Sequence, residues 1–479
     1  MTAPEPAPPT PLAGGTAGPA ALRPLLDTVL DALAAGAVAR GGPLPAGGPE
    51  AVTARVRATL GDPLPARGTG AGEALTTLVT LLAEGAADPA DPACLAHLHC
   101  PPLAVAAAAD LAASCLNPSL DSWDQAPAAS ALEALVTRAL AAELYGTSST
   151  GAPTTGTPGT GTPTADALIT TGGTESNQLA LLLARERHPR RPVRLVHGAA
   201  AHHSLPRAAW LLGLPEPLCL PTPAGLLDPA VLDRALAGVT GPVLVAATAG
   251  TTDAGLIDPL PEIAAVCARH GAELHVDAAY GGLLALSPRH RHLLDGLDRS
   301  HSVTVDLHKL GWQPAAAGLL AVPDGRLLAP LGQRADYLNA ADDTEAGLPD
   351  LLGRSLRTTR RPDVLKTAVT LRALGRAGLA ALVDRTCATA QRLATLLDAH
   401  PRFEVHAPPV LSTVLFRPVG MPDPEVAALR RGLLLDGRAV LGRATADGRL
   451  WLKATLLNPR TGPGDLDRLV TLLEGSTHR

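Results

Sequence analysis

The feature that most limits the possible folds is an alternation of strands and helices between residues 165 and 309. Apolar runs such as residues 242–248 (PVLVAAT) predict buried strands, whereas residues 175–187 place Leu and Ala on one helical face. Strands that alternate with helices are typical of an α/β domain built on a mostly parallel sheet. We therefore predict a large domain in which helices flank such a sheet.

Polar residues and glycines follow the carboxyl ends of the predicted strands. They are Gly172 and Gly173, His202, Thr248, Asp277 and Lys309. The carboxyl ends of parallel strands meet at one edge of a sheet, and open α/β sheets bind their ligands at that edge. We expect these residues to surround one ligand site.

Lys309 closes the predicted strand 302–306 and follows Asp306 and His308. A lysine at the end of a buried strand is costly unless its amine is paired, deprotonated or used covalently. The simpler alternative is a side chain that reaches solvent along its apolar stem. The choice depends on the rest of the site.

A lysine, an acid and an anion cradle together fit pyridoxal phosphate. The Gly172–Gly173 turn opens a helix, and unpaired amides at a helix start favour an anion such as phosphate. Asp277 would pair with the pyridine nitrogen, His202 would lie over the ring, and Lys309 would bond to the aldehyde. Each residue alone has a simpler interpretation. The glycines could serve the backbone, Asp277 could be a turn acid, and either His202 or His203 could be an ordinary turn residue.

Composition excludes several classes of protein. The chain has 479 residues, so two or three packed units are expected. Its 40 basic and 45 acidic residues give a net charge of −5 without long blocks, which argues against nucleic-acid or anionic-membrane partners. Six cysteines without regular spacing are typical of reduced thiols in a cytoplasmic protein. No uncharged apolar run reaches membrane-spanning length.

The chain divides by composition into four parts. Residues 1–20 read as a disordered tail and not a signal peptide, and 21–100 as a helical N-terminal segment. Residues 101–365 form the predicted large domain, with a flexible Thr/Gly/Pro insertion at 147–164, and 366–479 a small α+β domain. Residues 333–353 are irregular and acidic, either disordered or a lid, and a helix is expected over 355–375.

His97 and His99 could together suggest metal binding, because residues two apart share a face on a strand. No third ligand stands at a regular spacing, so we expect no metal site.

Several motifs make the chain resemble the group II pyridoxal-phosphate-dependent decarboxylases of fold type I. They are TGGTESN at 171–177, AHHS at 201–204, ATAGTT at 247–252, HVDAAYG at 275–281 and DLHK at 306–309, with LDSWDQ at 120–125, TTRR at 358–361, LK at 365–366 and LNP at 457–459. Within that family, AHLHCP at 96–101 and SLRTTRR at 355–361 are most similar to bacterial diaminobutyrate and siderophore-type lysine decarboxylases.

The resemblance implies a role for each matched residue. It makes Lys309 the Schiff-base lysine, Asp277 the partner of the pyridinium and His202 the histidine stacked on the ring. Residues implied to contact the cofactor elsewhere are Gly172, Gly173 and Thr174 at the phosphate, Thr248 and Ala279 beside the ring, and His308 next to the lysine. The implied protein is a cytoplasmic homodimer.

The sequence departs from the family pattern in several places. Many members carry an asparagine that touches the phosphate where this chain has Asp306. The aromatic amino-acid enzymes have a catalytic tyrosine in a mobile loop, and residues 339–354 contain none. Pro362 replaces an aromatic or small residue, and the 147–164 insertion directly precedes the phosphate motif.

These observations predict decarboxylation of an amino acid to its amine and CO₂, with lysine, ornithine or 2,4-diaminobutyrate as the substrate. Asp121, Asp124 and the acids between 342 and 350 are available to bind a basic side chain. The alternatives are a fold type I aminotransferase, a decarboxylation-coupled oxidase, or a non-catalytic relative that binds the cofactor. Aminotransferases commonly place Tyr or Phe over the ring, so His202 and the His308–Lys309 pair favour the decarboxylase.

Overall fold

The computed structural model describes residues 11–146, 164–332, 338 and 341–477, and all structural statements below concern these residues. The predicted insertion at 147–164 lies outside them except for Thr164. The first ten residues of the predicted tail also lie outside, and a helix begins at Gly18 within its last part.

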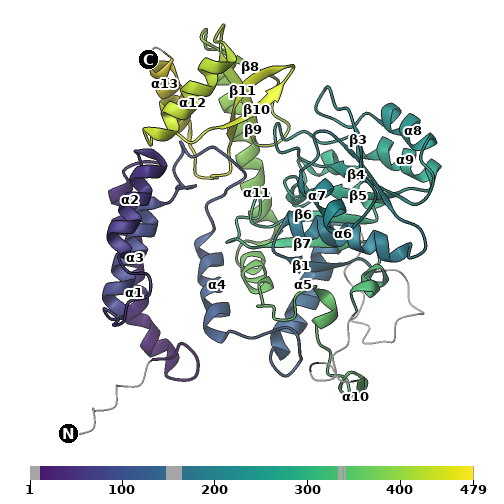
Figure 1. The fold of residues 1–479 in the computed structure, drawn as a ribbon, viewed down its shortest axis with the longest axis horizontal. Coiled ribbons are helices and arrows are strands. Elements are labelled where there is room, and N and C mark those ends of the chain that lie inside the picture. The colour runs from purple at the N-terminus through teal and green to yellow at the C-terminus, as the bar shows by residue number, and fades with distance from the viewer. Residues whose placement is uncertain (1–10, 147–163, 333–337, 339–340, 478–479) are drawn as a thin grey trace.

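A seven-stranded sheet forms the core of the larger part of the molecule (Figure 1), and this confirms the predicted α/β fold class. Its strands are β1 (Asp166–Thr170), β2 (Arg194–Gly198), β3 (Leu218–Leu220), β4 (Val243–Thr248), β5 (Glu273–Asp277), β6 (Ser302–Asp306) and β7 (Gly318–Val322). They lie in the order β1-β7-β6-β5-β4-β2-β3. Strands β6, β5, β4, β2 and β3 are parallel, while β7 runs antiparallel to its neighbours β1 and β6.

Helices cover both faces of this sheet, which explains why its central strands are buried along nearly their whole length. On one face, Leu244 and Ala246 pack with α6 (Gly173–Arg187) and α7 (Ser204–Leu211). On the other face, Val245 and Ala247 belong to the core formed with α5, α8, α9 and α11. The bounds of these helices are Pro127–Tyr145, Pro229–Ala237, Leu260–His270 and Val364–Asp398.

A smaller antiparallel sheet forms the C-terminal part. Its strands are β8 (Phe403–Val405), β9 (Thr413–Pro418), β10 (Gly442–Ala446) and β11 (Arg449–Thr455), in the order β10-β11-β9-β8. Helices α12 (Asp423–Leu435) and α13 (Pro463–Ser476) pack on it. Helix α11 joins the two cores and is interrupted at Gly375, where φ is 64° and ψ is 179°.

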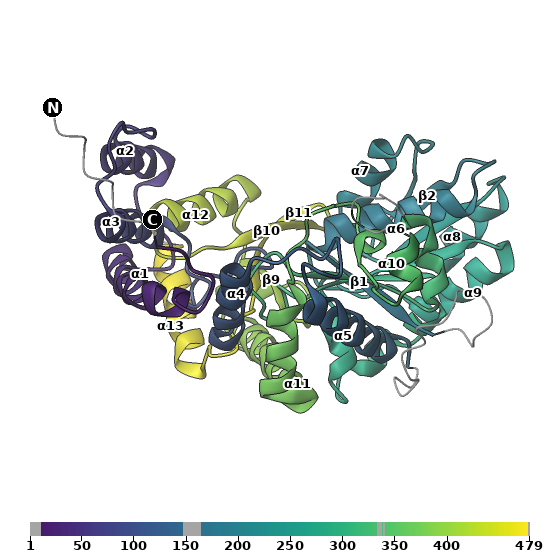
Figure 2. The ribbon, with the colours of Figure 1, turned by 90° about the horizontal axis from the view of Figure 1, so that it is seen from below.

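Three N-terminal helices stand to one side of the molecule, away from the seven-stranded sheet (Figures 1 and 2). They are α1 (Gly18–Arg40), α2 (Gly48–Leu60) and α3 (Ala71–Gly85), and α4 (Ala104–Leu116) follows them. Large apolar side chains of this unit remain exposed, among them Val38 at 82% and Leu82 at 73%. The helices of the described structure include none that is both long and apolar enough to cross a membrane.

The prediction of a helix over residues 355–375 was wrong for its first part, residues 355–363. Helix α11 begins at Val364, because Pro362 disfavours a helical conformation in the residue before it. Residues 355–363 are instead held by α5 and its preceding loop. The buried Arg360 guanidinium pairs with Glu133 at 2.8 Å, and the Arg360 carbonyl accepts a hydrogen bond from the Leu120 amide.

The remaining described helices are short. They are the 3₁₀ helices at Gly282–Leu286, Arg291–Leu294, Leu297–Arg299, Gly325–Leu331 and Leu352–Arg354, together with α10 (Ala341–Glu345) within the stretch predicted to be irregular.

Candidate active site

A cavity of about 300 Å³ lies at the carboxyl edge of the parallel strands. All nine residues predicted for the site line it, namely Gly172, Gly173, Thr174, His202, Thr248, Asp277, Ala279, His308 and Lys309. The register explains part of this convergence, since Thr248 pairs with Asp277 across β4 and β5, and Asp277 with Thr304 across β5 and β6.

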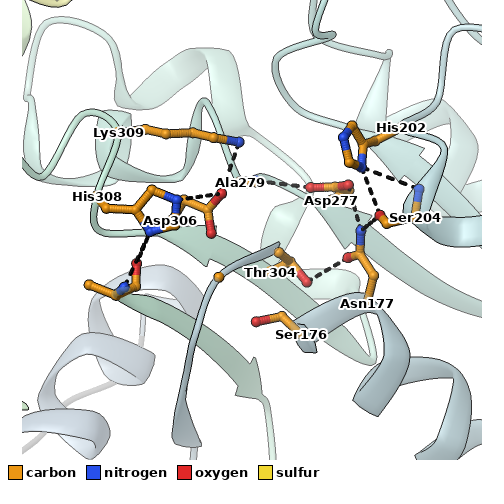
Figure 3. A network of polar contacts seen from close by, with 12 residues as sticks. Ser176, Asn177, His202, Ser204, Asp277, Ala279, Thr304, Asp306, His308 and Lys309 are labelled. Carbon is orange, nitrogen blue, oxygen red and sulfur yellow. Dashed lines mark hydrogen bonds and ion pairs between the residues drawn. The ribbon is translucent and has the colours of Figure 1, made fainter. Parts of the chain in front are cut away.

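Lys309 reaches the cavity from the turn after β6 (Figure 3). Its Nζ lies 2.8 Å from Oδ2 of Asp306, and Nε2 of His308 lies 3.7 Å from the same oxygen. The other ring nitrogen of His308, Nδ1, donates to the Ala317 carbonyl at 2.8 Å. The lysine amine is therefore held beside an acid and a fixed imidazole at the cavity wall.

The start of α6 forms an adjoining wall, where Gly172 and Gly173 pack closely against side chains of the same cavity. A Cβ on Gly172 would lie 2.8 Å from Cε1 of His308, and one on Gly173 would lie 3.1 Å from Cβ of Ala279. Gly172 also has φ of 151°, which favours glycine. Free amides at this helix start suit a phosphate group, so the residues present fit the anionic end of pyridoxal phosphate.

Asp277 is buried at the end of β5 and fixed by two hydrogen-bond donors. Its Oδ1 accepts from the Ala279 amide at 3.1 Å, and its Oδ2 accepts from Nδ2 of Asn177 at 2.8 Å. Asn177 is itself held, because Oδ1 accepts from Oγ1 of Thr304 at 2.8 Å and from Nε2 of His275 at 3.0 Å. Burial lowers the pKa of His275 to about 4, although the nearby Asp277 opposes this, so the ring is neutral.

His202 belongs to the same network (Figure 3). Ser204 Oγ accepts from Nδ2 of Asn177 at 2.9 Å and lies 2.8 Å from Nδ1 of His202, to which it can donate its own hydrogen. The neutral His202 ring then carries its hydrogen on Nε2. Burial lowers the pKa of His202, while the charge of Asp277 acts in the opposite direction.

A second chamber of about 560 Å³ adjoins the first and shares Leu98, His202, Thr252, His308 and Lys309 with it. Its other lining residues include His97, His99 and Lys453. Nζ of Lys453 donates to the Thr252 carbonyl at 3.0 Å and lies 3.7 Å from Asp253, and burial lowers its pKa.

The acids predicted to bind a basic substrate do not line either chamber. Asp121 accepts a hydrogen bond from Gln125 at 2.7 Å, and Asp350 caps the Leu352 amide at 2.7 Å. Asp124, Asp342, Asp343 and Glu345 are also absent from the residues described as lining the two chambers. Across the described chain, no group of three or more His, Cys, Asp or Glu side chains is arranged to hold a metal ion.

Sequence reasoning did not assign roles to Asn177, Thr252 or Lys453. Asn177 ends the TGGTESN motif, and a buried asparagine one helical turn after a Gly-Gly cradle is the signal that could have singled it out. Lys453 lies on β11, far along the chain from Thr252, so no local spacing could have joined the two residues.

Comparisons with known proteins agree with this geometry. The pyridoxal-dependent decarboxylase conserved domain matches residues 70–419. An L-2,4-diaminobutyrate decarboxylase of Rhizobium meliloti is 40% identical over 87% of this chain and 84% of its own length. One from Acinetobacter baumannii is 30% identical over 82% of this chain and 81% of its own length.

A solved structure is similar over nearly the whole chain. It is described as the glutamate decarboxylase domain of a diaminobutyrate–pyruvate transaminase and L-2,4-diaminobutyrate decarboxylase from Vibrio parahaemolyticus. The two chains superpose with a TM-score of 0.82 at 30% identity, covering 98% of this chain and 97% of the other. The chain therefore belongs to the pyridoxal-dependent decarboxylase family, whose members use pyridoxal phosphate to decarboxylate amino acids.

Proposed function

We propose that this chain decarboxylates L-2,4-diaminobutyrate, with ornithine and lysine as less favoured substrates. The observation that carries the reaction is the convergence of Lys309, Asp277 and the Gly172–Gly173 turn on one cavity. The choice of a diamino acid is supported by the names of the two relatives that match most of the chain.

The proposed cofactor contacts follow from the cavity walls. Gly172, Gly173 and Thr174 would hold the phosphate, Asp277 would face the ring nitrogen, and His202 would lie over the ring. The amine of Lys309 would bond to the aldehyde, with Thr248, Ala279 and His308 completing the walls. When bound, pyridoxal phosphate supplies an aldehyde that captures the substrate amine and a protonated ring that accepts the electron pair left by CO₂.

The protein groups orient the reaction and handle its protons. Asn177 orients the Asp277 carboxylate, and the carboxylate charge would favour a proton on the ring nitrogen. His202, with its hydrogen on Nε2, lines the cavity, and Nζ of Lys309 lies beside Asp306. These two groups are the candidate proton donors among the residues described as lining the cavity.

The second chamber favours one other substrate class, the acidic amino acids. His97, His99 and Lys453 line it, and its described lining contains no acid. A carboxylate side chain would therefore find more complementary charge there than an ammonium group. However, every amino acid also brings an α-carboxylate, which one cation of this chamber could bind. A basic chamber therefore does not by itself select an acidic side chain.

A substrate panel separates these proposals. We expect L-2,4-diaminobutyrate, L-ornithine or L-lysine to exceed L-glutamate, L-tyrosine and L-tryptophan in kcat/KM by ~10–100-fold, because the two relatives that match most of the chain are named for a diamino-acid substrate. This range corresponds to one charge-assisted hydrogen bond of ~1.5–3 kcal/mol, which an ammonium group can also donate to a neutral acceptor. Mass spectrometry should identify the amine and CO₂ as products. A 2-oxo acid would indicate transamination and an aldehyde would indicate oxidation. A preference for L-aspartate or L-cysteine sulfinate would transfer the assignment to the acidic class.

We also propose that the enzyme is a cytoplasmic homodimer. The exposed apolar side chains of α1 and α3 would be covered by a second copy, since large apolar patches on a surface mark contacts between proteins. The six cysteines are free, as expected of a reducing compartment.

Light scattering after gel filtration should give twice the mass of one chain. Charging the exposed apolar side chains with Val38→Glu and Leu82→Glu together should shift the protein toward the monomer, because the new carboxylates would be buried without partners. Val419→Glu changes an exposed apolar residue outside the three helices and serves as the matched control, with an unchanged mass. A monomeric wild-type protein at all concentrations would contradict the proposal.

A further inference from the structure

Asp306 combines deep burial with an incomplete set of hydrogen-bond partners. Only 3% of the residue is exposed, and no hydrogen-bond partner within the described structure reaches its Oδ1. Its Oδ2 pairs with Nζ of Lys309 at 2.8 Å. A buried carboxylate oxygen without a donor is costly, so Oδ1 is a group whose partner should come from a ligand.

The free oxygen faces the glycine turn that suits a phosphate. A Cβ on Gly172 would lie 3.4 Å from Oδ1 of Asp306, and one on Gly173 would lie 3.3 Å from Oδ2 and 3.5 Å from Oδ1. The carboxyl group thus borders the same space as the first amides of α6. An anion in that space would lie beside both the amides and the acid.

Placing a phosphate there creates a conflict of charge. A phosphate ester carries between one and two negative charges near neutral pH. Two anionic groups that share a buried site cannot both remain fully ionised, so one of them binds a proton. In the free protein the ammonium of Lys309 neutralises Asp306, but this charge is no longer reserved for the acid once the lysine amine bonds to the cofactor.

We propose that Asp306 binds the phosphate of pyridoxal phosphate in its protonated form and donates a hydrogen bond through the oxygen that is free in this structure. This inference rests on the proposed cofactor site. It gives Asp306 the phosphate contact that the family resemblance implies for an asparagine at this position, and it requires the uptake of one proton when the cofactor binds. Affinity for the phosphate is then highest at low pH and falls as the pH rises, because the complex holds the proton more tightly than the free protein does.

The other charged groups around Asp306 define the competing interpretations. Lys309 and His308 face it from the turn after β6, and Nε2 of His308, at 3.7 Å, could instead take up the proton. Across the cavity, Asp277 belongs to β5 and His202 to the loop before α7. Glu175 on α6 already has hydrogen-bond partners, since its Oε2 accepts from the Thr171 amide and from the Thr171 hydroxyl.

Titration calorimetry of the apoprotein tests the proposal. Pyridoxal phosphate and pyridoxal both carry the aldehyde, so the difference in their proton uptake reports only the phosphate. Uptake is measured at pH 8 in two buffers of different ionisation enthalpy. We expect wild-type protein to take up about one more proton with pyridoxal phosphate than with pyridoxal, and Asp306→Asn to lose this difference. In wild-type protein, the ratio of the affinity for pyridoxal phosphate to the affinity for pyridoxal should fall by up to ~10-fold for each unit of pH increase. In Asp306→Asn this ratio should not change with pH.

Three outcomes would overturn the assignment to Asp306. They are an equal proton count for the two ligands in wild-type protein, a difference that persists in Asp306→Asn, and a difference that His308→Gln alone removes. A ³¹P shift that marks the bound phosphate as the protonated partner would also overturn it. Circular dichroism and the Tm of each apoprotein check that the variants fold. If borohydride reduction leaves no pyridoxyl group on Lys309 of the wild-type protein, the cofactor site itself fails, which is a separate result.

Discussion

Replacing Lys309 with alanine should abolish turnover and covalent attachment of the cofactor. The amine lines the same cavity as the glycine turn, beside Asp306, and would form the bond to the aldehyde. We expect kcat/KM to fall by at least ~10⁴-fold, equivalent to ~5 kcal/mol of transition-state stabilisation. The wild-type protein should be yellow and lose its colour on borohydride reduction, whereas Lys309→Ala should bind the cofactor without forming a reducible bond.

Peptide mapping can assign the bond without ambiguity, because the chain contains only three lysines, Lys309, Lys366 and Lys453. Lys366 is buried and pairs with Asp110 at 3.1 Å and Asp363 at 3.4 Å. Lys453 is the informative control, since it lines the adjoining chamber and burial lowers its pKa. Lys453→Ala should keep the pyridoxyl group on Lys309, and an adduct that maps to Lys453 would refute the assignment.

Replacing Asp277 with asparagine should leave the cofactor attached while slowing decarboxylation by ~10²–10⁴-fold, or ~3–5 kcal/mol. The carboxylate would no longer stabilise a proton on the ring nitrogen, so the ring would accept electrons poorly. The measurement is single-turnover decarboxylation of the fully loaded variant, together with the absorption spectrum of the bound cofactor.

Asp258 provides the matched control for losing a buried acid near the site. Its carboxylate accepts from the Leu227 amide at 2.8 Å and the Thr248 amide at 2.7 Å, and burial raises its pKa to about 6. Asp258→Asn should lower the free energy of unfolding by about 1–3 kcal/mol. Its kcat should stay within ~10-fold of wild type. If both variants slow the reaction equally, Asp277 has no special role.

The fold class could be predicted because both signals behind it are local. Strand and helix periodicities lie within single segments, and the rule that parallel strands share a carboxyl edge then gathers their terminal residues. The position of β7 could not be predicted, because its antiparallel insertion between β1 and β6 depends on pairings between distant segments. The error at residue 355 arose because Arg357, Arg360 and Arg361 favour a helix locally. The contacts of Arg360 with Glu133 and Leu120 instead hold the segment in place.

Nine of the residues that line the first cavity could be brought together from the sequence, whereas the lining of the second chamber could not. The nine predicted residues all follow strands or open α6, so one topological rule brings them together. The second chamber joins His97, Thr252 and Lys453, which come from three separate segments of the chain. In the sequence, His97 belongs to the AHLHCP motif and could act as a metal ligand, but no local pattern links it to Thr252 or Lys453.

The hydrogen bonds of Asn177 determine whether protons can move through the network around Asp277. Both amide hydrogens are given to Ser204 and Asp277, and the oxygen receives from Thr304 and His275. An amide can neither gain nor lose a proton near neutral pH, so a chain of bonds that passes through it cannot act as a proton wire. The network is thus a proton insulator that still transmits electrostatic field. Asp277 can therefore polarise whatever lies in the cavity without exchanging protons with Ser204, Thr304 or His275 through Asn177.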